Sequence, residues 1–101
     1  MPSSRRVYRS AHVSLAHLYH SLGELSEAES KPSDARHYYQ LSIDNFEAVQ
    51  FQGPPFARVL EEYSRLIQPS DKKVAKALHT RARKMASAFS EFKQQGVALG
   101  Y

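Results

Sequence analysis

The sequence predicts an all-α protein in which four amphipathic helices form antiparallel hairpins, and three observations lead to this fold class. Apolar residues recur at steps of three and four over most of the chain, which is the period of a helix with one buried face. Proline and glycine interrupt the pattern at a few points, most clearly at 53–55. No segment alternates apolar and polar residues as a half-buried strand does. The 101 residues suffice for one modest core, so we expect a single domain over 1–101.

The first helix is expected over 4–22. It should end at Gly23, because glycine adopts the left-handed conformation of a helix C-terminus without a Cβ penalty. The polar and acidic segment 24–32 is then expected to be a loop. The expected buried stripe consists of Tyr8, Ala11, Leu15, Leu18, Tyr19 and Leu22.

The second helix is expected over 34–49, with Ser33 as its N-cap, and completes a first hairpin over 4–50. Its apolar positions again follow the helical period. The expected stripe consists of Ala35, Tyr39, Ser42, Phe46 and Val49.

A second hairpin is expected over 54–95, followed by a tail over 96–101. Pro55 suits the first turn of the third helix, and Pro69 ends that helix. Ser70 is expected to cap the fourth helix, and Gly96 to end it. The third helix should bury Phe56, Val59, Leu60, Tyr63, Leu66 and Ile67, and the fourth Val74, Leu78, Ala82, Met85, Phe89 and Phe92.

Composition and charge exclude some kinds of site and indicate where the protein is located. The chain contains no cysteine, which excludes disulfides, a thiolate nucleophile and cysteine-based zinc sites. This favours an intracellular protein of the cytoplasm or nucleus, and no apolar run approaches the roughly 20 residues of a transmembrane segment. Residues 1–23 carry three arginines and no acid. An arginine- and serine-rich start is also typical of mitochondrial targeting, but the apolar stripe continues through it and favours a short lead into the first helix.

The stretch AHVSLAHLYHSLGELSEA at 11–28 resembles the first helix and turn of a tetratricopeptide (TPR) repeat. Ala16, Tyr19 and Gly23 stand at that family's positions. The stretch ARHYYQLSIDNF resembles the second helix, so the resemblance covers about 9–50. The predicted turn is about seven residues longer than the family's, so either Ala28 or Ala35 is the packing alanine.

The resemblance implies a protein-binding function. In TPR proteins the first helices line a groove that receives a peptide, and the corresponding residues here are Ser10, Val13, His17, His20 and Ser21. Two hairpins are fewer than the three or so repeats that a helical solenoid needs, so apolar helix faces should stay uncovered. We therefore expect a non-enzymatic adaptor, or a small subunit of a larger helical complex.

Two alternatives stay open. DARHYYQLSIDNFEAV is similar to the middle helix of MIT modules, which bind peptides in membrane trafficking, although 54–68 would then be an additional helix. The fourth helix also carries a basic surface that suits nucleic acid or an anionic membrane, or is simply its solvated outer face. That surface consists of Lys72, Lys73, Lys76, Arg83 and Lys84.

Catalytic and metal chemistry find little support. No phosphate-binding glycine loop or nucleophile elbow occurs, and we predict neither an enzyme nor a cofactor. His17, His20 and Glu24 lie close to one helical stripe, and His37 or His79 would have to complete a metal site. An i, i+4 pair between His20 and Glu24 is the commoner arrangement, so no metal is predicted.

Overall fold

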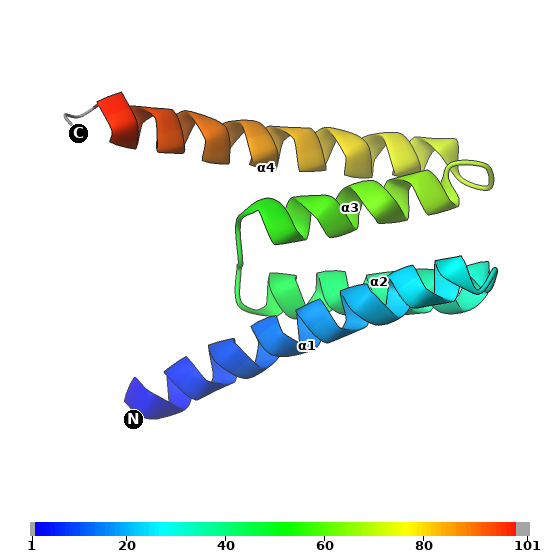
Figure 1. Ribbon diagram of the computed structural model, residues 1–101, viewed down its shortest axis with the longest axis horizontal. Coiled ribbons are helices and arrows are strands. Elements are labelled where there is room, and N and C mark those ends of the chain that lie inside the picture. Colours follow the sequence, from blue (N-terminus) through cyan, green and yellow to red (C-terminus); the bar gives the residue numbers. More distant parts are fainter. Residues whose placement is uncertain (1, 99–101) are drawn as a thin grey trace.

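Two helical hairpins lie side by side and confirm the all-α fold class (Figure 1). The computed structural model describes the backbone of residues 2–98 and the side chains of residues 9–88. The helices are α1 (Pro2–Ala28), α2 (Pro32–Ala48), α3 (Pro54–Ile67) and α4 (Lys72–Ala98). The short helices α2 and α3 lie between the long helices α1 and α4, which form opposite edges (Figure 1). No helix of the described chain has the length and apolarity needed to cross a membrane.

The end of α1 was predicted wrongly. Gly23 lies inside α1, which continues to Ala28, so the predicted loop 24–32 is mostly helix. A Cβ at Gly23 would lie 2.5 Å from Cε1 of Tyr39, so this glycine allows the ring of α2 to approach rather than ending the helix. The turn between the helices is only 29–31 and contains Ser30 at a φ of 60°. The residues that were predicted to lengthen the turn therefore belong mostly to α1.

The two inner helices agree closely with the prediction. The expected stripe of α2 is buried throughout, and Ala35, fully buried, is the packing alanine, whereas Ala28 is exposed. The predicted N-cap Ser33 was wrong, because Lys31 occupies that position and Pro32 begins the helix. In α3 the expected core residues are buried, except Leu66, which is half-buried.

The outer helix α4 differs at both ends from the prediction. The side chain of Asp71, rather than Ser70, caps its start, since the amide of Val74 donates to Asp71 Oδ1 at 3.2 Å. Gly96 does not end the helix, which continues to Ala98. Val74 was predicted to be buried, but it is 45% exposed and lies outside the core. The side chains of Phe89 and Phe92, and residues 99–101 of the predicted tail, lie outside the described residues.

Large core side chains come from the inner helices, and the outer helices contribute small ones. Ala16 of α1 and Ala75 of α4 are buried against α2 and α3, respectively. The buried hydroxyl of Ser42 donates to the carbonyl of Ala16 at 2.7 Å, and Ser64 donates to that of Ala75 at 2.6 Å. Both hairpins therefore use the same close contact, in which an inner serine bonds to the backbone of an outer helix.

The buried face of α1 was also predicted wrongly. Among the residues of α1 whose side chains the structure describes, Ala16, Gly23 and Ser26 are buried, and they are small enough to pack against the aromatic side chains of α2. The leucines expected in the core lie on another face, where Leu15 is 39% and Leu18 52% exposed. The prediction followed the largest apolar residues, whereas close packing on Tyr39 and Phe46 selected the smallest.

Candidate functional site

The predicted partner-binding residues lie on two parts of α1. Ser10 and Ser21 are exposed, and Val13 is half-buried. The ring of His17 is exposed but meets the ring of Phe46 edge-on, with centroids 5.6 Å apart. His20 differs from the expectation of a free groove residue, because its side chain is only 12% exposed and contacts α3. Two predicted binding residues, His17 and His20, thus make contacts within the fold.

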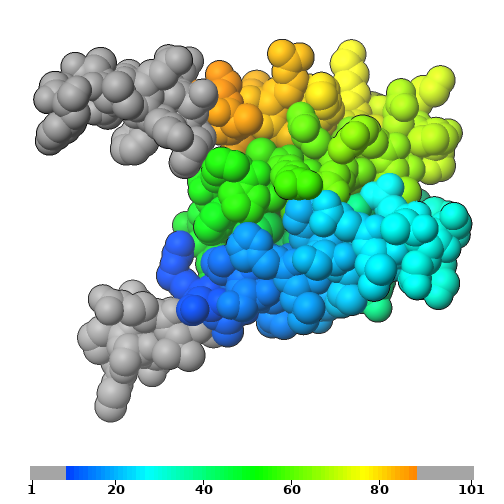
Figure 2. Space-filling view, viewed as in Figure 1, coloured from blue at the N-terminus to red at the C-terminus, as the bar shows by residue number. Residues whose placement is uncertain are grey.

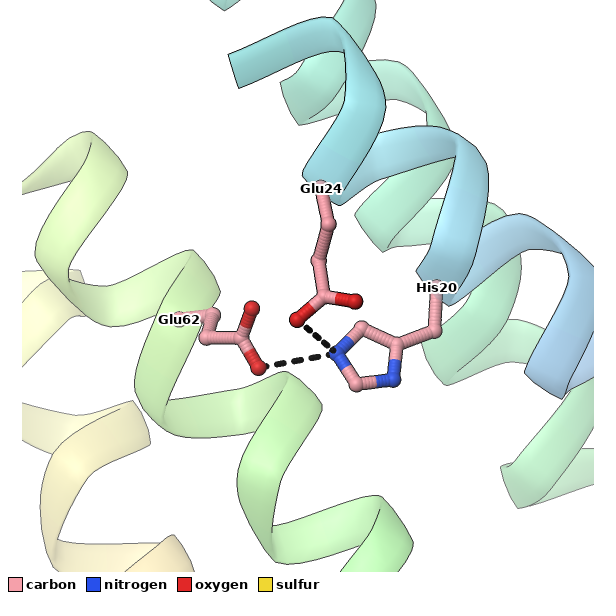
Figure 3. Close-up of side chains that lie close together, drawn as sticks. All are labelled: His20, Glu24 and Glu62. Carbon is pink, nitrogen blue, oxygen red and sulfur yellow. Dashed lines mark hydrogen bonds and ion pairs between the residues drawn. The ribbon is translucent and has the colours of Figure 1, made fainter. Parts of the chain in front are cut away.

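A polar cluster joins α1 to α3 (Figure 3). His20 Nε2 lies 2.8 Å from Glu62 Oε2 and 3.5 Å from Glu24 Oε2. We call His20, Glu24 and Glu62 the His20 cluster. The Glu62 side chain is 12% exposed and the Glu24 side chain 41%, so the cluster lies at the edge of the interface. The sequence indicated the pair within α1, but Glu62 is 42 residues from His20 and only the packing of α1 near α3 brings them together.

Two more side chains complete the network around this cluster. Arg58 of α3 places Nε 3.2 Å from Glu62 Oε2 and Nη2 3.6 Å from Glu24 Oε2. The hydroxyl of Tyr39 donates to Glu27, and it also lies 3.4 Å from Glu62 Oε1. Positive charge from Arg58 thus faces both carboxyl groups.

The two carboxyl groups of the cluster have opposite pKa shifts. A hydrogen bond with Glu62, together with partial burial, raises the pKa of Glu24. Burial alone would raise the pKa of Glu62, but hydrogen bonds with Glu24 and His20 and the charges of His20 and Arg58 outweigh burial and lower it. Burial and the neighbouring carboxylates raise the pKa of Tyr39 far above its usual value, so it is a donor and not a phenolate. Glu24 is therefore the carboxyl group of this pair that binds a proton more readily.

Glu62→Gln and Glu24→Gln are expected to change the pH dependence of stability in opposite ways. The lowered pKa of Glu62 stabilises the fold above the ordinary value of 4.5, and this contribution is lost as the pH falls. The Glu62→Gln variant should therefore lose less stability than the wild type as the pH falls. Near neutral pH the substitution should lower the free energy of unfolding by about 1–3 kcal/mol, because His20 and Arg58 lose a partner.

The contribution of Glu24 to stability changes with pH in the opposite direction. Because its pKa is raised, its contribution is full below 4.5 and is lost as the pH rises through the folded value. Glu24→Gln keeps a neutral hydrogen-bonding group, so near neutral pH it should leave stability unchanged or slightly increased. Urea denaturation of both variants at about pH 7 and about pH 4 measures the difference. Identical pH profiles for wild type and both variants would contradict the assigned shifts.

The His20 cluster has the composition of a metal site, and its ligand atoms all lie within 4.8 Å of one another. One imidazole and two carboxylates suit a divalent transition metal. However, the same atoms already bond to one another and to Arg58, which supplies the positive charge in place of an ion. His37 and His79, the expected sources of a further ligand, lie elsewhere: one beside the ring of Tyr38 and the other 3.9 Å from Glu61. The cluster is best described as an ion-pair network between helices.

The predicted basic surface is exposed along α4. Lys72 and Lys76, with Arg65 and His79, line a hollow of about 460 Å³ between α3 and α4. The other members of the predicted set, Lys73, Arg83 and Lys84, are exposed outside this hollow. Arg81 has a structural contact, because it pairs with Glu47 of α2 at 2.9 Å and lies over the ring of Phe56.

The most extensive exposed apolar feature of the described side chains is on the outer face of α1. We call Leu15, Leu18, Leu22 and Leu25 the leucine ridge. Leu18 is 52% and Leu25 54% exposed, whereas Leu22 is half-buried. Sequence analysis found three of these residues but placed them in the core, because it assumed that the large side chains of a helix face its neighbours.

No protein-family model, curated protein or solved structure matches this chain. The resemblances to TPR repeats and to MIT modules therefore stay predictions, and function has to be argued from the described surfaces.

Proposed function

We propose that this chain is a non-enzymatic protein-interaction module that binds other proteins through the outer face of α1. The observation that carries the proposal is the leucine ridge. Three leucines that are 39–54% exposed on one helix form a contiguous apolar surface, which is typical of a face that another protein covers. The residues predicted to line a groove, Ser10, Val13 and His17, lie on a different face of α1 and are proposed as a second, more polar contact.

The geometry of the ridge favours a helical partner. Its residues follow one another at steps of three and four along α1, so they form a straight strip of leucine side chains. A strip of this kind buries its side chains best against the apolar face of another helix. An adaptor or a subunit of a larger helical assembly uses contacts of this kind.

Leu18→Asp is expected to reduce binding of other proteins by at least about tenfold, because a carboxylate would have to be desolvated within an apolar contact. The measurement is quantitative mass spectrometry of proteins captured by the immobilised chain. Val74→Asp is the matched control, since Val74 is 45% exposed on α4, on the other edge of the molecule. Val13→Asp tests the groove separately. Capture that is unchanged by Leu18→Asp would refute the role of the ridge.

A second candidate function is supported by the basic hollow between α3 and α4. Four basic residues around one hollow favour a ligand with several negative charges, such as nucleic acid or an acidic protein. Binding of this kind would weaken with added salt and with Lys72→Glu plus Lys76→Glu, two residues that line the hollow, and would not respond to Leu18→Asp. The same capture experiment, repeated at raised salt, separates the two functions.

A further inference from the structure

We propose that the hollow between α3 and α4 binds a compact anion that carries two or more adjacent phosphate groups. This inference rests on the second candidate function, because it concerns the same hollow, but it names a small ligand in place of nucleic acid or an acidic protein. It is carried by three features of the hollow: cations on both of its walls, a floor of small side chains, and the absence of an acid from its lining.

Both helices contribute exposed basic side chains to the hollow. Lys72, Lys76 and His79 follow one another along α4 at steps of four and three, so they share one face of that helix. Arg65 and Gln68 form the other wall, on α3. A ligand between these walls meets guanidinium and ammonium groups, which only donate hydrogen bonds, from two directions. Figure 2 shows α4, in yellow to orange, along an outer edge of the molecule beside α3, in green.

The floor of the hollow is small and already satisfied. Ser64 and Ala75 line it, both are buried, and the hydroxyl of Ser64 donates to the carbonyl of Ala75 at 2.6 Å. The hollow therefore lies between long side chains above a close helix contact. Its volume of about 460 Å³ falls within the range of about 300–1,000 Å³ that is usual for small-ligand sites. A nucleic acid spreads its charges along its length and would use only part of such a hollow.

The cations of the hollow are not neutralised within the described part of the chain. Among the side chains of residues 9–88, Arg65, Lys72 and Lys76 have no ion-pair partner. By contrast, Arg58 and Arg81 are paired with glutamates and serve the packing of the helices. Three like charges around one hollow repel one another, and a bound anion removes this repulsion.

No acid lines the hollow, and none occurs over residues 72–90. The two acids close to it in sequence have other contacts. Asp71 caps α4 through the amide of Val74, and Glu61 lies 3.9 Å from His79. The fixed positive charge of the hollow therefore comes from Arg65, Lys72 and Lys76.

This arrangement of donors favours phosphate over carboxylate. Adjacent phosphate groups place several negative charges and many acceptor oxygens within one small volume, whereas the carboxylates of an acidic protein carry one charge each on separate side chains. A guanidinium group binds phosphate oxygens in a bidentate manner, and an ammonium group binds them as a point charge. Arg65 supplies the first kind of contact, and Lys72 and Lys76 supply the second.

Calorimetric titration of the full chain with tripolyphosphate at low salt tests the proposal. The expected Kd is about 100 μM or tighter, and inorganic phosphate should bind at least about tenfold more weakly. Lys72→Gln plus Lys76→Gln should weaken tripolyphosphate binding by at least about tenfold. Lys73→Gln plus Lys84→Gln is the matched control, because it removes the same charge from exposed positions outside the hollow and should change the Kd by less than about twofold.

Arg65→Gln tests the contribution of the second wall. It should weaken binding by at least about fivefold, since it removes the bidentate contact from α3. These substitutions are all at exposed positions, and circular dichroism checks that each variant keeps its helices. Absence of tripolyphosphate binding up to about 1 mM would overturn the inference, and so would equal losses in the two double variants, which would indicate attraction to the whole basic surface.

Two further probes separate the sources of phosphate. Vesicles of phosphatidylcholine with phosphatidylinositol bisphosphate test a lipid headgroup. If vesicles and tripolyphosphate both bind, and Lys72→Gln plus Lys76→Gln weakens both, the headgroup is a source of the phosphates; binding of tripolyphosphate alone supports a free ligand. Vesicle binding without tripolyphosphate binding would overturn the inference in favour of a membrane surface. If a single-stranded oligonucleotide binds and tripolyphosphate does not, this inference fails while the second candidate function stands.

Discussion

Phe46→Ala is expected to lower the free energy of unfolding by about 3–5 kcal/mol, among the largest effects of a single core substitution. Phe46 is fully buried in α2, and its ring lies 4.9 Å from the ring of Phe51 and 5.1 Å from that of Phe56. His17 of α1 contacts the same ring edge-on. Removing this side chain leaves a cavity where α1, α2 and α3 meet, and small domains have only about 5–15 kcal/mol of stability.

Urea denaturation followed by circular dichroism measures this loss, at one fixed protein concentration for all variants. Phe51→Ala is the matched control, because Phe51 is the same residue type but only half-buried. It should therefore lower stability less than Phe46→Ala does. Equal losses for the two variants would contradict the central position of Phe46 in the core.

Gly23→Ala is expected to lower the free energy of unfolding by about 1–3 kcal/mol, although the same change at an exposed helical position stabilises by about 1 kcal/mol. The added Cβ would lie 2.5 Å from Cε1 and 2.6 Å from Cδ1 of Tyr39. The ring cannot easily move aside, because Tyr39 is fully buried and its hydroxyl bonds to Glu27.

A double-mutant cycle with Tyr39→Leu isolates this contact. In the Tyr39→Leu background the ring is absent, so the additional loss caused by Gly23→Ala should become small or reverse its sign. Ser21→Ala, at an exposed position of the same helix, is the control and should change stability by less than about 0.5 kcal/mol. If Gly23→Ala stabilises the wild-type chain, the close approach of α1 and α2 is wrong.

The inner helices could be predicted from the sequence because their largest apolar residues are also their buried ones. The buried face of α3 could be predicted from the prolines at 54–55 and the apolar spacing from Phe56 to Ile67. That of α2 could be predicted from the apolar stripe from Ala35 to Val49. Local signals and tertiary packing agree in these two helices. Their prediction required only the helical period and the known effect of proline.

For α1 the local and tertiary signals disagree. Gly23 has the residue type of a helix end, but its role is to admit the ring of Tyr39, which no local pattern shows. The leucines were predicted to be buried because hydrophobicity alone does not distinguish a face that packs within the chain from one that is left exposed. Small residues such as Ala16 carry a weak signal for burial, although they decide how closely two helices approach.

The His20 cluster was predictable only in part. The pair of His20 and Glu24 follows from their i, i+4 spacing, and Arg58 and Glu62 in α3 have the same spacing. Each pair could be found separately. Their meeting depends on how α1 and α3 are placed by α2, and this placement is a property of the packed hairpins rather than of any segment.

The order of the helices along the chain has a kinetic consequence. The main packing interfaces join α1 to α2, α2 to α3 and α3 to α4, so each helix packs chiefly on its neighbour in sequence. Forming these interfaces closes only short loops and sacrifices little chain entropy before contacts form. We therefore expect this chain to fold rapidly, as helical proteins with mostly local contacts do.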